Sequence, residues 1–144
     1  MNLAARMGAR KLLVDKCDAL QKLPEQLGEL CSLGNLQLLD LPSLTHLPES
    51  MQRLTSLRFL NLIECHVLTQ LPESLGELST LRTLWIQSCR GFKSLPSFIG
   101  RLTALEELLI RDNAELVGRC REGVGEDWHL VSHIPYLELL DGAD

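Results

Sequence analysis

The sequence predicts a repeat solenoid of the α/β class, and two observations predict it. The first is a pair of residues, Leu-Pro, that recurs every 24 residues. The second is a set of further apolar columns with the same period, one of which holds Leu12, Leu36, Leu60, Leu84 and Leu108. Self-similarity at a fixed period of this size is typical of stacked supersecondary units. The Leu-Pro pairs are Leu23-Pro24, Leu47-Pro48, Leu71-Pro72 and Leu95-Pro96.

Each repeat is expected to contain one strand and one short helical or 3₁₀ turn. In the copy from Leu57 to Thr80, the spacing Leu57-x-x-Leu60-x-Leu62 gives the near-alternation of a strand. Pro72 then occupies a position that favours the start of a helix, and Gly76 keeps that helix short. The unit resembles a leucine-rich repeat, which implies an arc with short parallel strands on the concave face and the helical turns on the convex face. About five layers are expected, beginning near Ala9, Leu33, Leu57, Leu81 and Leu105.

One slot after each strand holds Cys17, Cys65, Cys89 and Asn113. In leucine-rich repeats this slot is Asn or Cys, whose side chain can satisfy backbone groups where the strand turns away. Residues 24 apart lie in different layers, so buried thiols are expected here rather than a disulfide framework. Leu41 occupies the slot in the second layer, which is therefore expected to turn differently.

The two ends of the array differ in pattern. Residues 1–8 are interpreted as a partial or vestigial repeat, residues 9–118 as the leucine-rich repeats and residues 119–144 as a C-terminal cap in which Trp128 covers the last layer. An uncapped first layer would expose core leucines. The pattern therefore suggests the tail of a longer protein and self-association through the N-terminal layer.

Composition and charge limit the partners. The net charge of −5 argues against nucleic acid and anionic membranes, since both need a basic face. No apolar run approaches the roughly 20 residues of a membrane span, and the N-terminus does not look like a signal peptide. With the expected free thiols, this indicates a reducing, intracellular compartment, cytoplasmic or also nuclear.

No catalytic, cofactor or metal site is predicted. His129 and His133 are four residues apart, a spacing that can hold zinc on a helix, and Cys120 could join them. They lie in the expected cap without the glutamate of a metalloprotease motif, so a structural or exposed role is favoured. The glutamates that recur in the helical turns are expected to be solvated rather than a paired acid and base.

The concave face is the expected binding surface for a protein partner. Residues between the inward leucines of each strand point outward, and five strands about 4.8 Å apart would give a face roughly 19 Å across. Trp85 is the strongest candidate, because tryptophan is enriched at interaction hot spots. An exposed apolar patch of Leu39, Phe59, Ile63 and Trp85 is expected. The remaining candidate contacts are Arg58, Asn61, Arg82, Leu109 and Arg111.

A gradient of charge crosses the same face. Arg10 and Lys11 begin it, Arg58 and Arg82 continue it, and Glu106 with Glu107 end it. Such a gradient could orient a partner, since charge complementarity mainly sets encounter and register. The alternative is a solvated ladder in which Arg82 lies beside Glu106.

The repeat form Leu-Pro-x-x-Leu-Gly-x-Leu and the tail resemble plant intracellular nucleotide-binding leucine-rich-repeat immune receptors of the coiled-coil class. The tail residues that carry the resemblance are Arg119-Cys120, Gly125-Glu126-Asp127-Trp128 and His133-Ile134-Pro135. The resemblance implies sensing of a pathogen effector or a guarded host protein, and autoinhibitory contact with a nucleotide-binding domain. The chain departs from the family in having no GxxxxGK[ST] loop, so nucleotide binding is not carried over.

A non-catalytic recognition module of a disease-resistance receptor is therefore the favoured function. A stand-alone intracellular adaptor of the Ras-binding repeat type is the alternative, since those proteins share Leu-Pro repeat forms. The tail residues argue against that alternative, because a generic adaptor has no evident need for them.

Overall fold

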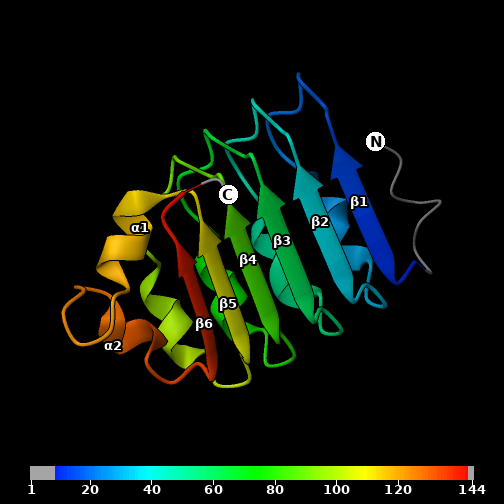
Figure 1. Ribbon diagram of the computed structural model, residues 1–144. Helices are drawn as coiled ribbons and strands as arrows, with labels where there is room; N and C mark the ends of the chain where they lie inside the picture. The colour runs from blue at the N-terminus through cyan, green and yellow to red at the C-terminus, as the bar shows by residue number, and fades with distance from the viewer. Residues whose placement is uncertain (1–8, 143–144) are drawn as a thin grey trace.

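A single parallel sheet runs through the whole described part of the protein (Figure 1). The computed structural model describes residues 9–142, so the expected partial repeat at residues 1–8 lies outside it. Each strand pairs with the next along the chain, as the solenoid prediction requires. The strands are β1 (Lys11–Asp15), β2 (Asn35–Leu39), β3 (Phe59–Ile63), β4 (Thr83–Gln87), β5 (Glu107–Arg111) and β6 (Tyr136–Leu140).

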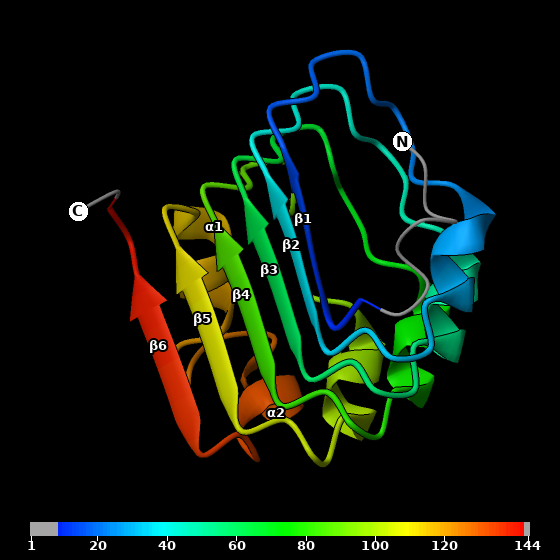
Figure 2. The ribbon, with the colours of Figure 1, turned by 90° about the vertical axis from the view of Figure 1, so that its right-hand side faces the viewer.

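Short 3₁₀ helices line the opposite, convex side of the array, as predicted (Figure 2). Each begins directly after the proline of a Leu-Pro pair, whose φ lies between −75° and −63°. Proline fixes φ in this range, which lowers the conformational entropy that the chain loses where it enters each helical turn. The helices are η2 (Glu25–Glu29), η3 (Glu49–Arg53), η4 (Glu73–Glu77) and η5 (Ser97–Arg101).

The core fills the space between the sheet and the 3₁₀ helices. The register of the sheet places equivalent leucines side by side, for example Leu36, Leu60, Leu84 and Leu108, and each of these is at most 1% exposed. Because one layer cannot enclose its own apolar side chains, burial depends on the layers on either side. The fold class predicted from the period is therefore confirmed.

Each of the first five strands is followed by a residue in the left-handed region that is not glycine, with φ between 52° and 57°. This conformation costs a non-glycine residue about 1–2 kcal/mol. It is retained because the amide continues the sheet ladder, as where Glu64 N donates to Gln87 O at 2.9 Å. Sequence reasoning missed this feature, since no glycine marks it. The residues are Lys16, Asp40, Glu64, Ser88 and Asp112.

The Cys/Asn slot satisfies the backbone as expected. Cys65 Sγ and Cys89 Sγ donate to carbonyls of the preceding layer at 3.6 and 3.4 Å. Asn113 Nδ2 donates to the carbonyls of Cys89 and Phe92, while its Oδ1 accepts from Leu116 N. The side chain of the slot residue therefore ties each layer to its neighbour.

Two expectations about this slot are wrong. Leu41 does not make the second layer turn differently: Leu44 N donates to Leu41 O at 3.3 Å, and Leu68 N makes the equivalent bond to Cys65 O at 3.4 Å. Leu41 fits because burial in the apolar core replaces the thiol hydrogen bond. Cys17 is exposed rather than buried, because no earlier layer covers it in residues 9–142. All five cysteines are free thiols.

The segment expected to be a cap also adds a sixth strand to the sheet. β6 pairs in register with β5, with Tyr136 opposite Glu107, an interval of 29 residues instead of 24. Two α-helices, α1 (Ala114–Arg119) and α2 (Trp128–Val131), occupy the longer connection. α2 packs against η5, and Trp128 is partly buried against the core.

The tail residues that carried the family resemblance hold this connection in place. Arg119 donates through Nε and Nη2 to the two carboxylate oxygens of Asp127, at 2.8 and 3.1 Å. Asp127 Oδ2 also accepts from Leu95 N at 3.2 Å, which ties the segment to the preceding layer. A Cβ on Gly125 would lie 2.1 Å from Arg119 O, so only glycine fits there. The motif is thus explained by contacts within the fold.

The first layer does not show the exposed core leucines that the uncapped end suggested. Leu12 is 3% exposed and Val14 is 6% exposed, and Leu27 and Leu30 are fully buried. The premise for self-association through exposed core leucines is therefore not met in the described residues.

Candidate protein-binding face

The outward side chains of the sheet form three columns across the concave face. The column that begins each strand contains Phe59, the middle column contains Asn61, Trp85 and Leu109, and the column that ends each strand contains Leu39, Ile63 and Arg111. Arg58 and Arg82 directly precede β3 and β4, and both are exposed. The sheet therefore brings the nine predicted contact residues onto one face and its adjoining edge.

An aromatic pair lies at the centre of this face. The rings of Phe59 and Trp85 meet edge to face, with their centroids 4.9 Å apart and an interplanar angle of 71°. This geometry is the one that aromatic quadrupoles favour, and it fixes both rings on neighbouring strands β3 and β4. The pair therefore presents a rigid aromatic surface to the concave side.

The expected exposed patch is more tightly packed than the sequence suggested. Leu39, Phe59, Ile63 and Trp85 are all half-buried rather than exposed. The reason is that side chains on adjacent strands of a concave face lean on one another, as the Phe59–Trp85 contact demonstrates. A partner would meet the upper surfaces of these side chains, while their lower parts remain packed.

Two predicted contact residues are buried, which corrects the expectation that they are open to a partner. Asn61 is 4% exposed and Leu109 is 8% exposed. Asn61 lies beside Trp85 in the sheet register, and its Oδ1 accepts from Gln87 Nε2 at 3.3 Å. Asn61 thus positions its neighbours rather than meeting solvent.

Two buried donors on this face have no hydrogen-bond partner in the described residues. They are Trp85 Nε1 and Arg111 Nε. Buried polar groups are normally hydrogen-bonded, so these two atoms mark where an additional acceptor would be most favourable.

The predicted charge gradient follows the edge where the strands begin. Arg82 Nη1 lies 3.9 Å from Glu106 Oε1 and also donates to Ala104 O at 3.4 Å, so the ladder predicted as an alternative is present at this point. At the other end, Arg10 and Arg58 make no ion pair within residues 9–142. The edge is therefore basic over β1 to β3 and acidic over β5.

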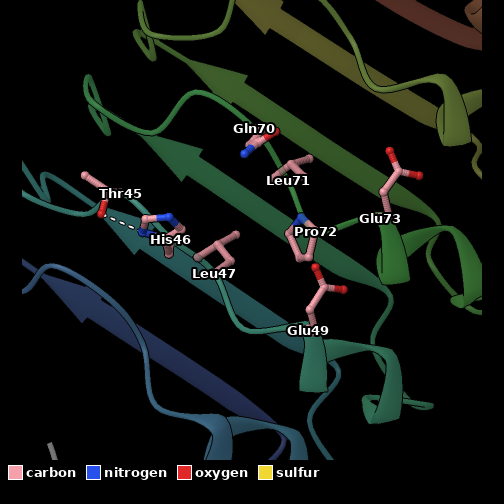
Figure 3. Close-up of a pocket in the computed structure, with 8 residues that line it drawn as sticks. All are labelled: Thr45, His46, Leu47, Glu49, Gln70, Leu71, Pro72 and Glu73. Atoms are coloured by element: carbon pink, nitrogen blue, oxygen red, sulfur yellow. Dashed lines mark hydrogen bonds between the residues drawn. The ribbon is translucent and has the colours of Figure 1, made fainter.

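A depression lies between the segment that joins β2 to η3 and the segment that joins β3 to η4 (Figure 3). Glu49 and Glu73, the first residues of η3 and η4, lie beside it and are exposed, and Thr45 Oγ1 lies 2.8 Å from His46 Nδ1. Both glutamates are exposed to solvent, and they line the depression together with Thr45 and His46.

The remaining candidates for chemistry are held in structural contacts. His133 Nε2 lies 3.1 Å from Leu102 O, and within residues 9–142 no group of three or more His, Cys, Asp or Glu side chains could hold a metal ion. Burial, reinforced by the charge of Asp127, raises the pKa of the Cys120 thiol to about 12. The pKa of the Cys89 thiol is also raised, through its interaction with the Cys65 thiol and through burial. Protonated thiols are poor nucleophiles, so these cysteines serve packing.

Fold and face together define a leucine-rich-repeat recognition solenoid. The chain matches the leucine-rich repeat region family over residues 9–122, and it belongs to that family. Members of this family are typically protein-interaction modules rather than enzymes. No helix in residues 9–142 has both the length and the apolar character needed to cross a membrane.

The chain is also similar to two known proteins. It superposes on the leucine-rich repeat domain of the type III effector XCV3220 (XopL) with a TM-score of 0.67 and 24% identity, covering 97% of this chain and 54% of that one. At this identity the likeness shows the fold alone. A stretch of 23 residues is 61% identical to the putative disease resistance protein RGA1 of Solanum bulbocastanum, which is 16% of this chain and 2% of that protein.

Proposed function

We propose that this protein is a non-catalytic recognition module of the plant disease-resistance receptor type, acting in the cytoplasm. Its partner would be a pathogen effector, a guarded host protein or a nucleotide-binding domain. The edge-to-face pair of Phe59 and Trp85 on the concave face is the observation that carries this proposal.

Several properties of the pair favour protein recognition. Aromatic side chains provide a large contact area at low conformational cost and dominate binding hot spots. Leu39 and Ile63 lie at the ends of the adjacent strands β2 and β3 and extend the apolar surface. A rigid apolar centre with a polar rim is the usual anatomy of a protein interface.

The disease-resistance assignment has support from a short sequence match and from the tail residues. The 23-residue match is to a putative disease resistance protein. The tail residues Arg119, Gly125 and Asp127 resemble those of the receptor class. The match covers 2% of that protein, so the class of partner is part of what we propose.

The test is the affinity of the chain for a purified nucleotide-binding domain of this receptor class, measured by isothermal titration calorimetry. Trp85→Ala should weaken binding by about 1 kcal/mol or more, or about fivefold or greater. Val124→Ala, which alters an apolar side chain that is 80% exposed in the C-terminal segment, should leave the affinity unchanged. If Trp85→Ala binds as tightly as the unaltered chain, the concave face is not the site.

A further inference from the structure

We propose that the edge where β1, β2 and β3 begin holds a binding pocket for a phosphoryl group on a side chain of the protein partner. Arg10, Ser32, Gly34, Ser56 and Arg58 line this pocket. The inference rests on the proposed function, because it adds a chemical requirement to the partner that the concave face would bind.

The pocket exists because one layer lacks a side chain. Arg10, Gly34 and Arg58 occupy equivalent positions directly before β1, β2 and β3. At Gly34 a Cβ would make only ordinary van der Waals contacts, with Ser56 O at 3.6 Å and Arg10 O at 3.7 Å, so the absence of a side chain leaves room beside it. With strands about 4.8 Å apart, the two arginines flank a gap roughly 10 Å wide between their main chains.

The donors around this gap are unused, whereas the equivalent donors one layer further on are occupied. Arg82 contacts Glu106 and Ala104 O, and Thr80 Oγ1 donates to Leu57 O at 2.8 Å. Ser56, at the position equivalent to Thr80, makes no side-chain hydrogen bond within residues 9–142, and neither does Ser32. The layer pair around Gly34 therefore offers two guanidinium groups and two hydroxyls that have no acceptor in the described residues.

This set of donors fits a phosphoryl group better than other anions. Guanidinium groups bind phosphate oxygens in a bidentate manner, and a phosphate monoester carries about −1.5 to −2 charges with three acceptor oxygens. A single carboxylate carries one charge on two acceptor oxygens, so it matches two guanidinium groups and two hydroxyls less well than a phosphate monoester does. Clusters of arginine are the usual means by which proteins recognise phosphorylated segments.

The wider charge distribution excludes a long polyanion. The protein carries a net charge of −5, and Glu106 and Glu107 lie on the same edge of the sheet, beyond Arg82. A nucleic acid or an anionic bilayer that reached the pocket would extend over these carboxylates. A single phosphorylated side chain would not.

The position relative to the aromatic pair links the two sites. Arg58 and Phe59 are consecutive residues, so the pocket adjoins the concave face at its central strand β3. A partner with an apolar side chain on Phe59 and Trp85 could therefore place a neighbouring phosphorylated residue in the pocket.

The test is an NMR titration of the ¹⁵N-labelled chain at constant ionic strength. The probes are a glycine-rich pentapeptide with a central phosphoserine, the same peptide with glutamate in its place, and inorganic phosphate. The phosphopeptide should shift the amide signals of Gly34 and Arg58 in a saturable manner, and at least tenfold more tightly than the other two probes. Equal binding of the glutamate peptide would make this a carboxylate site, and equal binding of inorganic phosphate would make it a site for the free anion; either result contradicts the proposal.

Matched variants localise the effect. Gly34→Glu introduces a carboxylate into the gap without a backbone clash, and Arg58→Gln removes a guanidinium; each should weaken the phosphopeptide at least tenfold. Arg82→Gln, in the occupied layer, should change the affinity less than twofold. Binding that survives both Gly34→Glu and Arg58→Gln, or no saturable shift at all, would overturn the proposal.

The same variants separate this inference from the proposed function. Trp85→Ala should leave phosphopeptide binding intact. If a protein partner depends on Trp85 while the phosphopeptide does not bind, the pocket inference alone fails. If the phosphopeptide binds in the pocket and no partner depends on Trp85, the concave-face proposal fails instead.

Discussion

The regular layers and the C-terminal segment complete the same sheet with different means. Between Lys11 and Arg111, every strand is held by leucines that fill identical slots, and a proline starts each 3₁₀ helix. Between Arg119 and Leu140, the chain reaches β6 through contacts that occur once: the Arg119–Asp127 ion pair, the tight approach at Gly125 and the packing of Trp128.

This difference teaches where each kind of stability comes from. A repeated core slot accepts another apolar side chain in one layer, as Leu41 in the cysteine column shows, because the position stays buried. A polar contact that occurs once depends on the particular residues that make it. The C-terminal segment should therefore be sensitive at a few polar positions, and the regular layers at their inward apolar positions.

The largest expected loss of stability comes from truncating an inward leucine, and it distinguishes the regular layers from the C-terminal segment. Leu60→Ala, at a fully buried position in β3, should lower the free energy of unfolding by about 2–5 kcal/mol, through lost transfer energy and the cavity left behind. Leu137→Ala in β6, where the side chain is only partly buried, should cost less than half as much. Urea denaturation followed by circular dichroism measures both; equal losses would mean that β6 is packed as fully as the central strands.

The next effect tests the ion pair of the C-terminal segment. Asp127→Ala removes the buried carboxylate that accepts from Arg119 and from Leu95 N, and it should cost about 1–3 kcal/mol. Glu126→Ala removes the other partner of Arg119, whose side chain is 77% exposed, and should cost less than about 0.5 kcal/mol. Urea denaturation provides the comparison, and similar losses for the two variants would contradict the role given to Asp127.

The same ion pair predicts how stability depends on pH. Burial raises the pKa of Asp127, but the hydrogen bond and charge of Arg119 together with the amide of Leu95 outweigh it, so the net pKa lies below its ordinary value. The contribution of Asp127 should be complete above pH about 3.9, the ordinary pKa of aspartate, and should disappear as pH falls through the lowered folded-state value. In Asp127→Asn, urea titrations should lose this part of the acid dependence; an unchanged profile would assign it to other groups.

A smaller effect comes from two glycines in the C-terminal part. Gly125→Ala should destabilise by about 1–3 kcal/mol, since its Cβ would overlap the main chain of Arg119. Gly118→Ala, in α1 with open space around it, should instead stabilise by about 0.5–1 kcal/mol through its higher helix propensity. Thermal denaturation distinguishes the two, and a stable Gly125→Ala variant would show that this turn can relax.

The smallest effect concerns the left-handed residue after each regular strand. Glu64→Gly removes the strain of a φ of 55° but increases the entropy of the unfolded chain. The net result should be a rise of about 0.5 kcal/mol in the free energy of unfolding. Gly123, with a φ of 75°, already uses glycine in the C-terminal segment, so Gly123→Ala should cost about 1 kcal/mol. A loss of stability in Glu64→Gly, measured by thermal denaturation, would mean that the Glu64 side chain makes a stabilising contact.

The sequence could predict the parts of the fold that depend on repetition. The period of 24 residues was sufficient for the parallel order of the strands and the 3₁₀ helices after each proline. It could not predict β6, because the 29-residue interval breaks the period, nor the left-handed residues, because they share only a position and not a residue type.

The face that holds Trp85 followed from strand alternation alone. The burial of Asn61 and Leu109 could not be predicted in this way, because it depends on how neighbouring side chains pack on the concave face. Gly34 was overlooked because its effect is visible only when the arginines of neighbouring layers are placed beside it.

The two tryptophans of the chain allow the most direct test of the concave-face proposal, because they lie in different regions. Trp85 is in β4 on the concave face, and Trp128 is in α2 on the convex side, against η5. The chain labelled with 5-fluorotryptophan should give two ¹⁹F signals, which Trp128→Phe assigns. When a nucleotide-binding domain of the receptor class is added, the Trp85 signal should shift and the Trp128 signal should stay in place. A shift confined to Trp128, or complex formation that moves neither signal, would contradict recognition through the concave face.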